Sequence, residues 1–558
     1  MSGYKLRIAI LTSRRAYPII KEEAEKTAKS LKEAVAIDVY ALPIDIAGFL
    51  SADGIAKIIL SNKALLEKLR SYDYILIPGN VKGDAEAITK ITGAKCFKAS
   101  SEPGLLLPVI EELLRGGELS TVLPAEEIIK ENLLENAYKY LEESWRKTKI
   151  AFTIDGLKIP LRSPPFVLAA EIPYSLDVED AIEYGLRFEE EGADIVVVGG
   201  LSPLDEERFL SKIRRLEDEL RRAIIGVDVD SPKLIIKSVK EGARLVLTMT
   251  PQNYIALSEI KKEAAFVASV FLSNTIDEIE AYTSFLSKAK NMGFENIIVD
   301  PLLSTPSHGI INTINKYSAL MERLPDYPFF ACYGNYAELA DVDPHGVIAL
   351  LSFMSAELGI SVIMVTADSW KTHESVGEAW TALHMASLSI PRKSNPHNIG
   401  LDLLLYRSKK PSPRPIIDES IRIVKIPDEK QSPQLDKWGY ITVWVDNNNE
   451  EITVCLHHYD DKSRDLCYRG KNAENLYKII LRNHSYFSLE HAAYLGYELA
   501  KANISLITGK SYVQDRELFE NIRTKIRSYE KLRIIKDKWA RGDSNPGPPG
   551  YQPGAPPS

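Results

Sequence analysis

The strongest constraint on the fold is a series of eight short apolar segments between residues 151 and 400. They read FVLAAE, DIVVVGG, IIGVDVD, RLVLTMT, AFVASVF, NIIVDP, PFFACYGN and SVIMVTAD, with helical patterns such as DVEDAIEYGLRFEEEG between them. Apolar runs of this kind are typical of strands buried on both faces of a parallel sheet. Eight such strands, each followed by a helix, over roughly 235 residues predict a closed (β/α)8 barrel.

Two further regions flank this α/β barrel. Residues 1–118 alternate the runs LRIAIL, IDVYAL, YILIP and KCFKA with helical patterns, which predicts a small flavodoxin-like α/β domain. Residues 119–150 are expected to form a helical linker. Residues 401–540 contain YITVWVD, EITVCLHHYD and a later helix, which indicates an α+β domain. The Pro- and Gly-rich tail, residues 541–558, is predicted to be disordered.

Composition argues against several classes of protein. The 558 residues are 45% hydrophobic and 26% charged, which is typical of a soluble protein with more than one domain. A net charge of −8 without a basic stripe argues against nucleic acid as a partner. No apolar run approaches the ~20 residues of a membrane span, and the start of the chain has no secretory pattern. The scattered cysteines favour neither a zinc ribbon nor a disulfide framework, so a reducing, cytoplasmic setting is expected.

Polar residues occur where the predicted strands end, and (β/α)8 barrels carry their sites on that face. Asp228 ends IIGVD and Asp300 ends NIIVD. A carboxylate in an apolar strand is costly to desolvate unless a partner satisfies it. Carboxylates that converge on one face suit a ligand with several N–H donors, such as a guanidine-like heterocycle edge. Nearby Asn or Thr side chains would then meet a ring nitrogen or carbonyl; the candidates are Thr248, Asn253 and Asn335.

Two loops at the same face are candidates for anion binding. After the eighth strand, TADSWKTHES supplies Ser369, Lys371 and Thr372 near a helix amino terminus, where hydroxyls, a lysine and free N–H groups favour phosphate. An ordinary helix cap with a solvated lysine explains the same residues. Gly199 and Gly200 end the second strand, where the lack of a side chain lets a ligand or another backbone approach closely.

Other polar features leave alternatives open. In the first domain, Pro78-Gly79-Asn80 ends a strand at an expected crevice, but GNVKGD does not match G-x-G-x-x-G. A nucleotide site and a plain turn both explain it. His308 and His345 lie in loops and could act as acid or base. Neither has a metal-binding spacing, so no structural metal is predicted.

Four of these segments resemble, in order, motifs of the pterin-binding barrels: GADIVVVGGLSP, IIGVDVDSP, IIVDPLLSTPSHG and YGN. That group comprises dihydropteroate synthase and the methyltetrahydrofolate-dependent corrinoid methyltransferases. The whole chain looks most like the archaeal dihydropteroate synthase-related proteins. The resemblance implies that Asp228, Asp300 and Asn335 bind a pterin, with Thr248 or Asn253 in place of an asparagine that the family carries on its fourth strand.

The resemblance also implies a reaction. A hydroxymethyl-dihydropterin diphosphate, with Mg2+ on its diphosphate, would be joined to an arylamine-type acceptor in folate- or methanopterin-type cofactor biosynthesis. Asp300 and Lys371 would be the catalytic residues. Two departures concern the diphosphate half: Ala170 replaces an asparagine of the synthases, and no arginine follows Gly199-Gly200. The alternatives are a methyl-tetrahydropterin-dependent methyltransferase and a non-catalytic pterin-binding or scaffold protein. The flanking domains would serve a homodimer or a partner subunit.

Overall fold

In the computed structural model the chain divides into two compact units, residues 1–412 and 413–558. The structure describes residues 5–31, 34–46, 51–200, 205–271, 278–397, 399–407, 436–447 and 449–519, together with positions 424, 426 and 531. Side chains of residues 130–136 are outside this description. The tail 541–558, predicted to be disordered, and the LSP segment 201–203 also lie outside the described residues.

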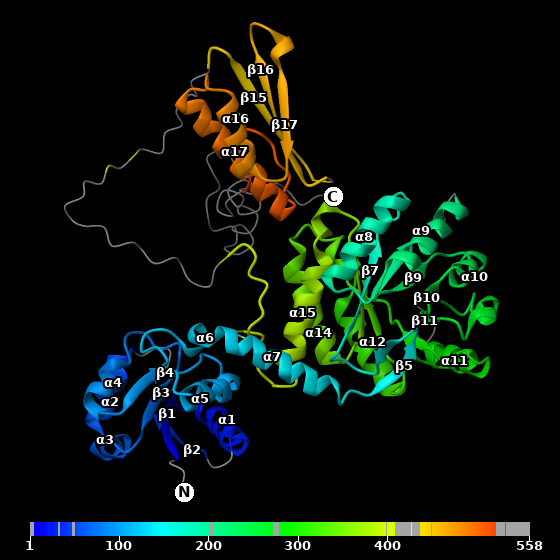
Figure 1. Cartoon of the computed structure of the whole chain (residues 1–558). Helices are drawn as coiled ribbons and strands as arrows, with labels where there is room; N and C mark the ends of the chain where they lie inside the picture. Colours follow the sequence, from blue (N-terminus) through cyan, green and yellow to red (C-terminus); the bar gives the residue numbers. More distant parts are fainter. Residues whose placement is uncertain are drawn as a thin grey trace, which may run out of the picture. The chain divides into compact units, whose positions relative to one another are not determined.

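The first sheet is a small doubly wound layer, which confirms the flavodoxin-like prediction. Its strands are parallel in the order β2-β1-β3-β4. Helices α2, α3 and α4 contribute to the core on one face and α1 and α5 to the core on the other (Figure 1). The bounds are β1 (Leu6–Ser13), α1 (Tyr17–Ser30), β2 (Val35–Leu42), α2 (Ala52–Ser61), α3 (Lys63–Leu69), β3 (Tyr74–Ile77), α4 (Glu86–Thr92), β4 (Lys95–Lys98) and α5 (Leu106–Leu114).

The second sheet consists of the eight parallel strands that the sequence predicts. Their order is β12-β11-β10-β9-β8-β7-β14-β13, and a parallel bridge between Val299 and Phe329 joins the two edge strands. The sheet is therefore a closed barrel, as predicted. The strands are β7 (Val167–Ile172), β8 (Ile195–Gly199), β9 (Ile224–Asp228), β10 (Ala243–Met249), β11 (Ala265–Ala268), β12 (Ile297–Val299), β13 (Phe330–Cys332) and β14 (Val362–Thr366).

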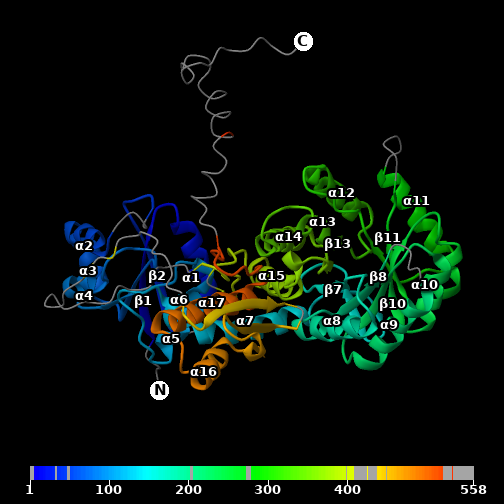
Figure 2. The ribbon, with the colours of Figure 1, turned by 90° about the horizontal axis from the view of Figure 1, so that it is seen from above.

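Helices surround these strands on the outside (Figures 1 and 2). Their apolar faces and the outward side chains of the strands form one large buried cluster. Between β10 and β11 a 3-10 turn, Ala256–Ile260, stands where the repeat would have a helix. The helices are α8 (Val178–Glu191), α9 (Glu206–Glu219), α10 (Pro232–Lys240), α11 (Glu278–Asn291), α12 (Ile310–Arg323), α13 (Gly334–Ala337), α14 (Pro344–Leu358) and α15 (Ser375–Ser389).

A hairpin that the sequence analysis did not predict contributes to the barrel interior. Its strands are β5 (Ile150–Ile154) and β6 (Leu157–Pro160), and the side chains of Ile154 and Ile159 are buried among the inward residues of the strands. The Ser361 hydroxyl, just before β14, donates to the carbonyl of Pro160 at 2.7 Å. The hairpin therefore lies at the amino-terminal end of the barrel and leaves the opposite mouth for function.

The predicted helical linker contains α6 (Ala125–Ile128) and α7 (Lys130–Trp145). Leu141 of α7 is buried in one cluster with Met385 and Leu388 of α15, so this helix packs against the outside of the barrel. Of the helices in the described ranges, none has both the length and the apolar character that crossing a membrane requires.

The second unit has the predicted α+β character. Strands β15 (Gly439–Asp446), β16 (Glu451–His458) and β17 (Leu466–Gly470) form an antiparallel sheet, and α16 (Ala473–Asn483) and α17 (Leu489–Thr508) share a core with one face of it. The sequence analysis predicted neither β17 nor α16. Both follow the turn-rich stretch after HHYDD, where the apolar pattern is short.

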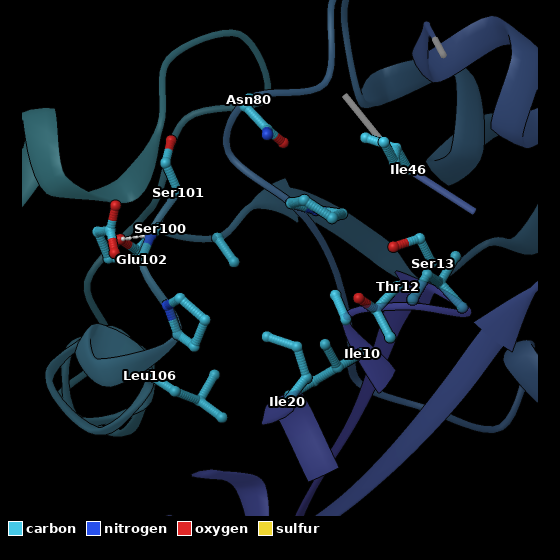
Figure 3. Close-up of a pocket in the computed structure, with 15 residues that line it drawn as sticks. Ile10, Thr12, Ser13, Ile20, Ile46, Asn80, Ser100, Ser101, Glu102 and Leu106 are labelled. Carbon is cyan, nitrogen blue, oxygen red and sulfur yellow. Dashed lines mark hydrogen bonds between the residues drawn. The ribbon is translucent and has the colours of Figure 1, made fainter. Parts of the chain in front are cut away.

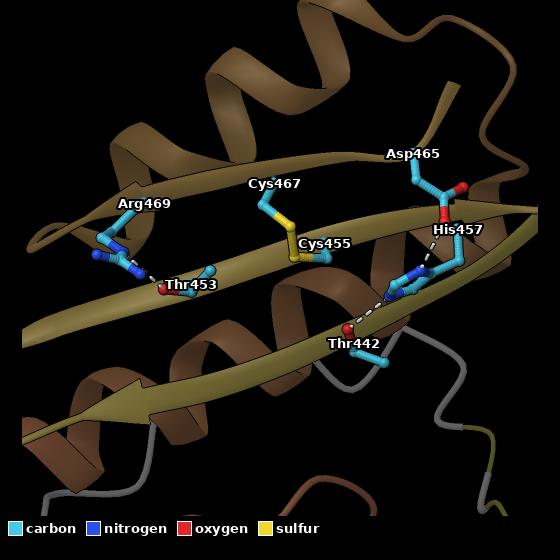
Figure 4. The surroundings of a disulfide bond; sticks show 7 residues. All are labelled: Thr442, Thr453, Cys455, His457, Asp465, Cys467 and Arg469. Carbon is cyan, nitrogen blue, oxygen red and sulfur yellow. Dashed lines mark hydrogen bonds and ion pairs between the residues drawn. A yellow bond between two sulfur atoms is a disulfide. The ribbon is translucent and has the colours of Figure 1, made fainter. Parts of the chain in front are cut away.

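The prediction of no disulfide is wrong. Cys455 of β16 and Cys467 of β17 are register partners with Cα atoms 4.0 Å apart, and they form a disulfide (Figure 4). The bridge lies beside the His457 side chain, which hydrogen bonds to Thr442 at 2.9 Å and Asp465 at 3.2 Å (Figure 4). The sequence did not predict this bond, because the pairing of β17 with β16 was not known from the sequence. Cys96 and Cys332 are free thiols.

We expect the disulfide to stabilise the second unit, because it closes a loop with a sequence separation of 12. Chain entropy for a loop of this length corresponds to about 3 kcal/mol. Changing both Cys455 and Cys467 to Ser should therefore raise amide exchange in β16 and β17, measured by hydrogen–deuterium exchange of the full chain. Reductant should do the same to the wild type and nothing to the double variant. Equal exchange in oxidised and reduced wild type would contradict the prediction.

Candidate active site

Closure of the barrel gathers three carboxyl groups at one mouth. Asp228 ends β9, Asp300 follows β12 directly, and Glu171 is the penultimate residue of β7. Burial raises the pKa values of Glu171 and Asp300, and the charge of Asp228 raises both further. Charges affect one another's pKa in this way only when they are close. The structure thus brings the two predicted aspartates together and places Glu171 close to them.

Asp300 is the most enclosed of the three, with 7% of its surface exposed. Its Oδ1 accepts a hydrogen bond from the Leu302 N–H at 2.8 Å, and its Oδ2 accepts one from the Ser269 hydroxyl at 3.3 Å. Burial nevertheless raises its pKa to about 7. Each carboxylate oxygen has two acceptor positions, so each oxygen keeps one for a ligand.

Asp228 is half-buried at the end of β9. Burial, followed by the neighbouring charge of Asp230, raises its pKa to about 6. Its carboxylate accepts no hydrogen bond from the residues that the structure describes. A desolvated, unpaired carboxylate costs free energy in the folded state. A ligand with N–H donors would recover that free energy.

Glu171 is a site residue that the sequence analysis left out of its candidates. Burial, followed by the charges of Asp228 and Asp368, raises its pKa to about 8, so the side chain is largely protonated at neutral pH. A Cβ on Gly199, in the neighbouring strand β8, would overlap the Glu171 Oε1. Gly199 therefore makes room for this carboxyl group. The segment FVLAAE placed Glu171 at a strand end, but only the pairing of β7 with β8 relates it to Gly199.

Thr248 and Asn253 form one local arrangement. The pairing of β10 with β11 shifts register between Leu247 and Met249, so Thr248 lies at a bulge. Bulges commonly redirect a side chain next to a functional site. The Asn253 side chain donates to the Thr248 carbonyl at 3.0 Å and accepts from the Thr250 N–H at 2.8 Å. Asn253 thus supports the backbone that carries Thr248, and the Thr248 side chain remains the candidate for ligand contact.

Asn335 lies in the short helix α13, directly after β13, and is exposed. Its side-chain amide donates to the Leu303 carbonyl at 3.1 Å. This bond joins the loop after β12, which carries Asp300, to the loop after β13. The predicted pterin contact of Asn335 stays a prediction, and its amide oxygen accepts no hydrogen bond from the residues that the structure describes.

The residues predicted to bind an anion have internal partners. The hydroxyls of Ser369 and Thr372 both donate to the Glu338 carboxylate, the former at 2.6 Å. The Lys371 ammonium donates to the carbonyls of Glu338 and Ala340 at 2.9 and 2.6 Å. A carboxylate of the chain itself thus occupies the position where the sequence suggested a phosphate.

The glycine pair also has contacts within the chain. The N–H of Gly200 donates to the Asp228 carbonyl at 3.1 Å, and Gly199 borders Glu171. With a φ of 153°, Gly200 adopts a backbone conformation that favours glycine. In the described part of the chain, no group of three or more His, Cys, Asp or Glu side chains is arranged to hold a metal ion.

The fold and the site together define a (β/α)8 barrel with a carboxylate-lined mouth, joined to an α/β layer and an α+β unit. A family model described as PterinBD-DUF4346 matches residues 435–515. The "Uncharacterized protein MJ0107" of Methanocaldococcus jannaschii is 30% identical over 540 residues, covering 92% of this chain and 99% of that protein. The chain belongs to the same family as MJ0107.

Solved structures of dihydropteroate synthases resemble the barrel region at low identity. The enzyme from Vibrio fischeri is 13% identical, covers 44% of this chain and 98% of its own, and has a TM-score of 0.36. The enzyme from Coxiella burnetii, in complex with pteroic acid, is 17% identical with the same coverage and a TM-score of 0.35. The barrel assignment itself rests on the strand order and closure described above.

We expect Gly199 and Glu171 to be energetically coupled. Gly199→Ala should destabilise the protein by about 1 kcal/mol, because the Glu171 carboxyl group, at the end of a flexible side chain, must move to admit the methyl group. In a Glu171→Ala background most of this cost should disappear. Urea unfolding of the four proteins measures this coupling.

Gly377→Ala is the matched control, because a Cβ at Gly377 meets nothing within 4 Å. This substitution should have the same small effect in both backgrounds. An identical cost of Gly199→Ala with and without the Glu171 side chain would show that the proposed contact has no energetic weight.

Proposed function

We propose that the barrel mouth binds a reduced pterin and that the protein is a pterin-dependent transferase. The observation that carries this proposal is the pair of desolvated carboxylates, Asp228 and Asp300, at the ends of β9 and β12. A pterin presents an amino group and a ring N–H side by side, and a carboxylate accepts both in parallel hydrogen bonds. The PterinBD description of the family model that matches residues 435–515 supports the same ligand class.

The ligand would resolve an unfavourable charge arrangement. With a pKa of about 7, Asp300 is about half protonated at neutral pH, and its ionised form lacks donors for two of its acceptor positions. Two N–H groups of a pterin would favour the ionised form. Glu171 is the most protonated of the three carboxyl groups, and its O–H group suits a ligand carbonyl or ring nitrogen.

The first candidate reaction joins a hydroxymethyl-dihydropterin diphosphate to an arylamine. The amine nitrogen would form a bond to the exocyclic methylene carbon as the carbon–oxygen bond breaks, and diphosphate would leave with that electron pair. The nitrogen would then lose one proton to solvent. The carboxylates would hold the pterin in position for this attack. Lys371, Ser369 and Thr372, with Mg2+, would receive the diphosphate. This requires the Glu338 carboxylate to leave the two hydroxyls that it now accepts from.

The second candidate is methyl transfer from a methylated tetrahydropterin to an acceptor. The contacts of Glu338 with Ser369 and Thr372 favour it, because a methyl donor has no diphosphate and leaves those contacts intact. Asn335, a predicted pterin contact, is exposed and close to the loop of Asp300 through its bond to Leu303. Both candidates use the same pterin-binding carboxylates.

A reduced pterin should raise the melting temperature of the full chain through Asp300. At a concentration of 100 Kd, a ligand that binds only the folded state stabilises it by about 2.7 kcal/mol. Asp300→Asn should abolish the shift, because an amide offers one acceptor and two N–H donors to the N–H groups of the ligand. Differential scanning fluorimetry with 7,8-dihydropterin measures this. Asp326→Asn, at an exposed carboxylate, is the control and should keep the full shift.

The pH dependence of binding follows from the same group. The ligand prefers ionised Asp300, whose pKa is about 7, so affinity should fall toward tenfold per pH unit below 7. It should also fall above pH 8, because Glu171, whose pKa is about 8, loses the proton that it donates to the ligand. Calorimetric titration between pH 6 and 8.5 measures this slope. A pterin response that is unchanged in Asp300→Asn, or that strengthens as pH falls below 7, would place the pterin elsewhere.

The two reactions differ in what Glu338 should do. If diphosphate is displaced, Glu338→Gln should bind 6-hydroxymethyl-dihydropterin diphosphate with Mg2+ about tenfold more tightly than the wild type, because a competing negative charge is gone. Binding of the unphosphorylated alcohol should not change. If methyl transfer is the reaction, the diphosphate compound should bind no better than the alcohol in either protein. Titration calorimetry of both compounds separates these outcomes.

A further inference from the structure

The small α/β layer contains a pocket that the barrel function does not use. Its sheet order, β2-β1-β3-β4, means that the chain leaves β1 toward one edge and returns to β3 on the other side. In open α/β sheets, ligands bind outside the carboxyl ends of the strands at such a switch point. A pocket of about 180 Å³ lies at this position, lined by the ends of β1, β3 and β4 and the starts of α1 and α5 (Figure 3).

Polar groups without partners face into this pocket. Thr12 and Ser13, the last residues of β1, are only 1% and 3% exposed. Their hydroxyls make no hydrogen bond to any residue that the structure describes. Figure 3 shows both hydroxyls turned toward the open space, with the Asn80 side-chain amide at its rim. Buried hydroxyls are normally hydrogen bonded, so this end of the pocket is suited to a ligand edge with donors and acceptors.

The remaining walls are apolar. Ile10 and Ile20 line one side and Leu106 lines another (Figure 3), and Pro103 is a further lining residue. Branched aliphatic side chains and proline present flat surfaces that a planar ring can contact on its faces. The pocket is smaller than the roughly 300–1,000 Å³ of a site that encloses a whole drug-sized ligand. It therefore has room for one ring system, and the rest of the ligand would lie outside.

Two arginines stand in the chain between the lining residues Ser13 and Ala16. Arg14 and Arg15 follow Ser13 in the chain, both are exposed, and neither guanidinium has a partner among the described residues. Helix α1 begins at Tyr17 without a side-chain cap and without an acidic residue in its first turn. Glu102, a lining residue, lies on the side opposite Ser13 (Figure 3) and is within 3.2 Å of His397. An anionic group on the Ser13 side would thus lie near these arginines and the first turn of α1, in which Pro18 has no N–H to donate.

We propose that this pocket binds a ligand of the nucleoside monophosphate class. The heterocycle enters between the aliphatic walls, and its polar edge bonds to the Thr12 and Ser13 hydroxyls and the Asn80 amide. The sugar lies at the opening, and the phosphate meets Arg14 and Arg15. Since no barrel residue takes part, this site is independent of the proposed pterin site.

Titration calorimetry of the full chain with AMP, GMP, CMP and UMP, and with the matching nucleosides and inorganic phosphate, tests the proposal. At least one nucleotide should bind with a Kd below 1 mM, and its nucleoside should bind at least tenfold more weakly. Thr12→Val should weaken nucleotide and nucleoside by a similar factor, about three- to tenfold for one lost hydrogen bond. The variant with Arg14→Gln and Arg15→Gln should weaken only the nucleotide.

Arg115→Gln provides the matched control, because Arg115 is exposed on the same domain, follows α5 and pairs with Glu111. It should leave nucleotide binding unchanged. The proposal is overturned if none of the four nucleotides binds at 1 mM, or if nucleosides bind as tightly as nucleotides. It is also overturned if Thr12→Val, shown to be folded by its unchanged circular dichroism, binds like the wild type. Each result can be obtained whether or not a pterin stabilises the barrel.

Discussion

Closure of the eight-stranded parallel sheet is the constraint on which the rest of the barrel depends. Strands β12 and β13 lie at opposite ends of the hydrogen-bonded order. The bridge from Val299 of β12 to Phe329, the residue before β13, joins these two ends and closes the sheet. Closure leaves no edge strand and forces all eight carboxyl ends to one mouth. With the β5–β6 hairpin packed into the interior, that mouth is where Asp228, Asp300 and Glu171 meet.

The meeting of these carboxyl groups has an energetic consequence. Each is partly or fully removed from water, and each raises the free energy of its ionised neighbours. In the interval between its unfolded and folded pKa values, a carboxyl group such as Glu171 binds more protons in the folded state, so stability falls as pH rises through that interval. This arrangement lowers the free energy of unfolding, and a ligand with N–H donors would offset part of that loss.

The charged and polar groups differ between the barrel mouth and the pocket of the small α/β layer. The barrel mouth is acidic and calls for hydrogen-bond donors, whereas the predicted phosphate loop after β14 is already satisfied by Glu338. The small α/β layer has the opposite character: the Thr12 and Ser13 hydroxyls inside, and the two arginines that follow them in the chain, have no side-chain partner among the described residues. A chain with both sites would bring a donor-rich heterocycle and an anionic ligand to one protein.

Local periodicity made much of the fold predictable. The apolar segments were long enough to identify every strand of the barrel and of the first layer, because burial on both faces leaves a continuous apolar run. The sequence analysis did not predict the β5–β6 hairpin, β17 or α16, because their apolar patterns are short. The disulfide was not predicted either, since a cross-strand pair can be recognised only when both strands and their register are known.

For the candidate site, the sequence by itself determined which polar residues stand at strand ends, including Asp228 and Asp300. The tertiary structure decided what each one faces. It brought Glu171 against Gly199 across two strands, and it placed Glu338 on Ser369 and Thr372 from 31 and 34 positions away. Those outcomes depend on the register and curvature of a closed sheet. The local sequence identifies the residues at each strand end, but the distances between these residues are set only when the sheet closes.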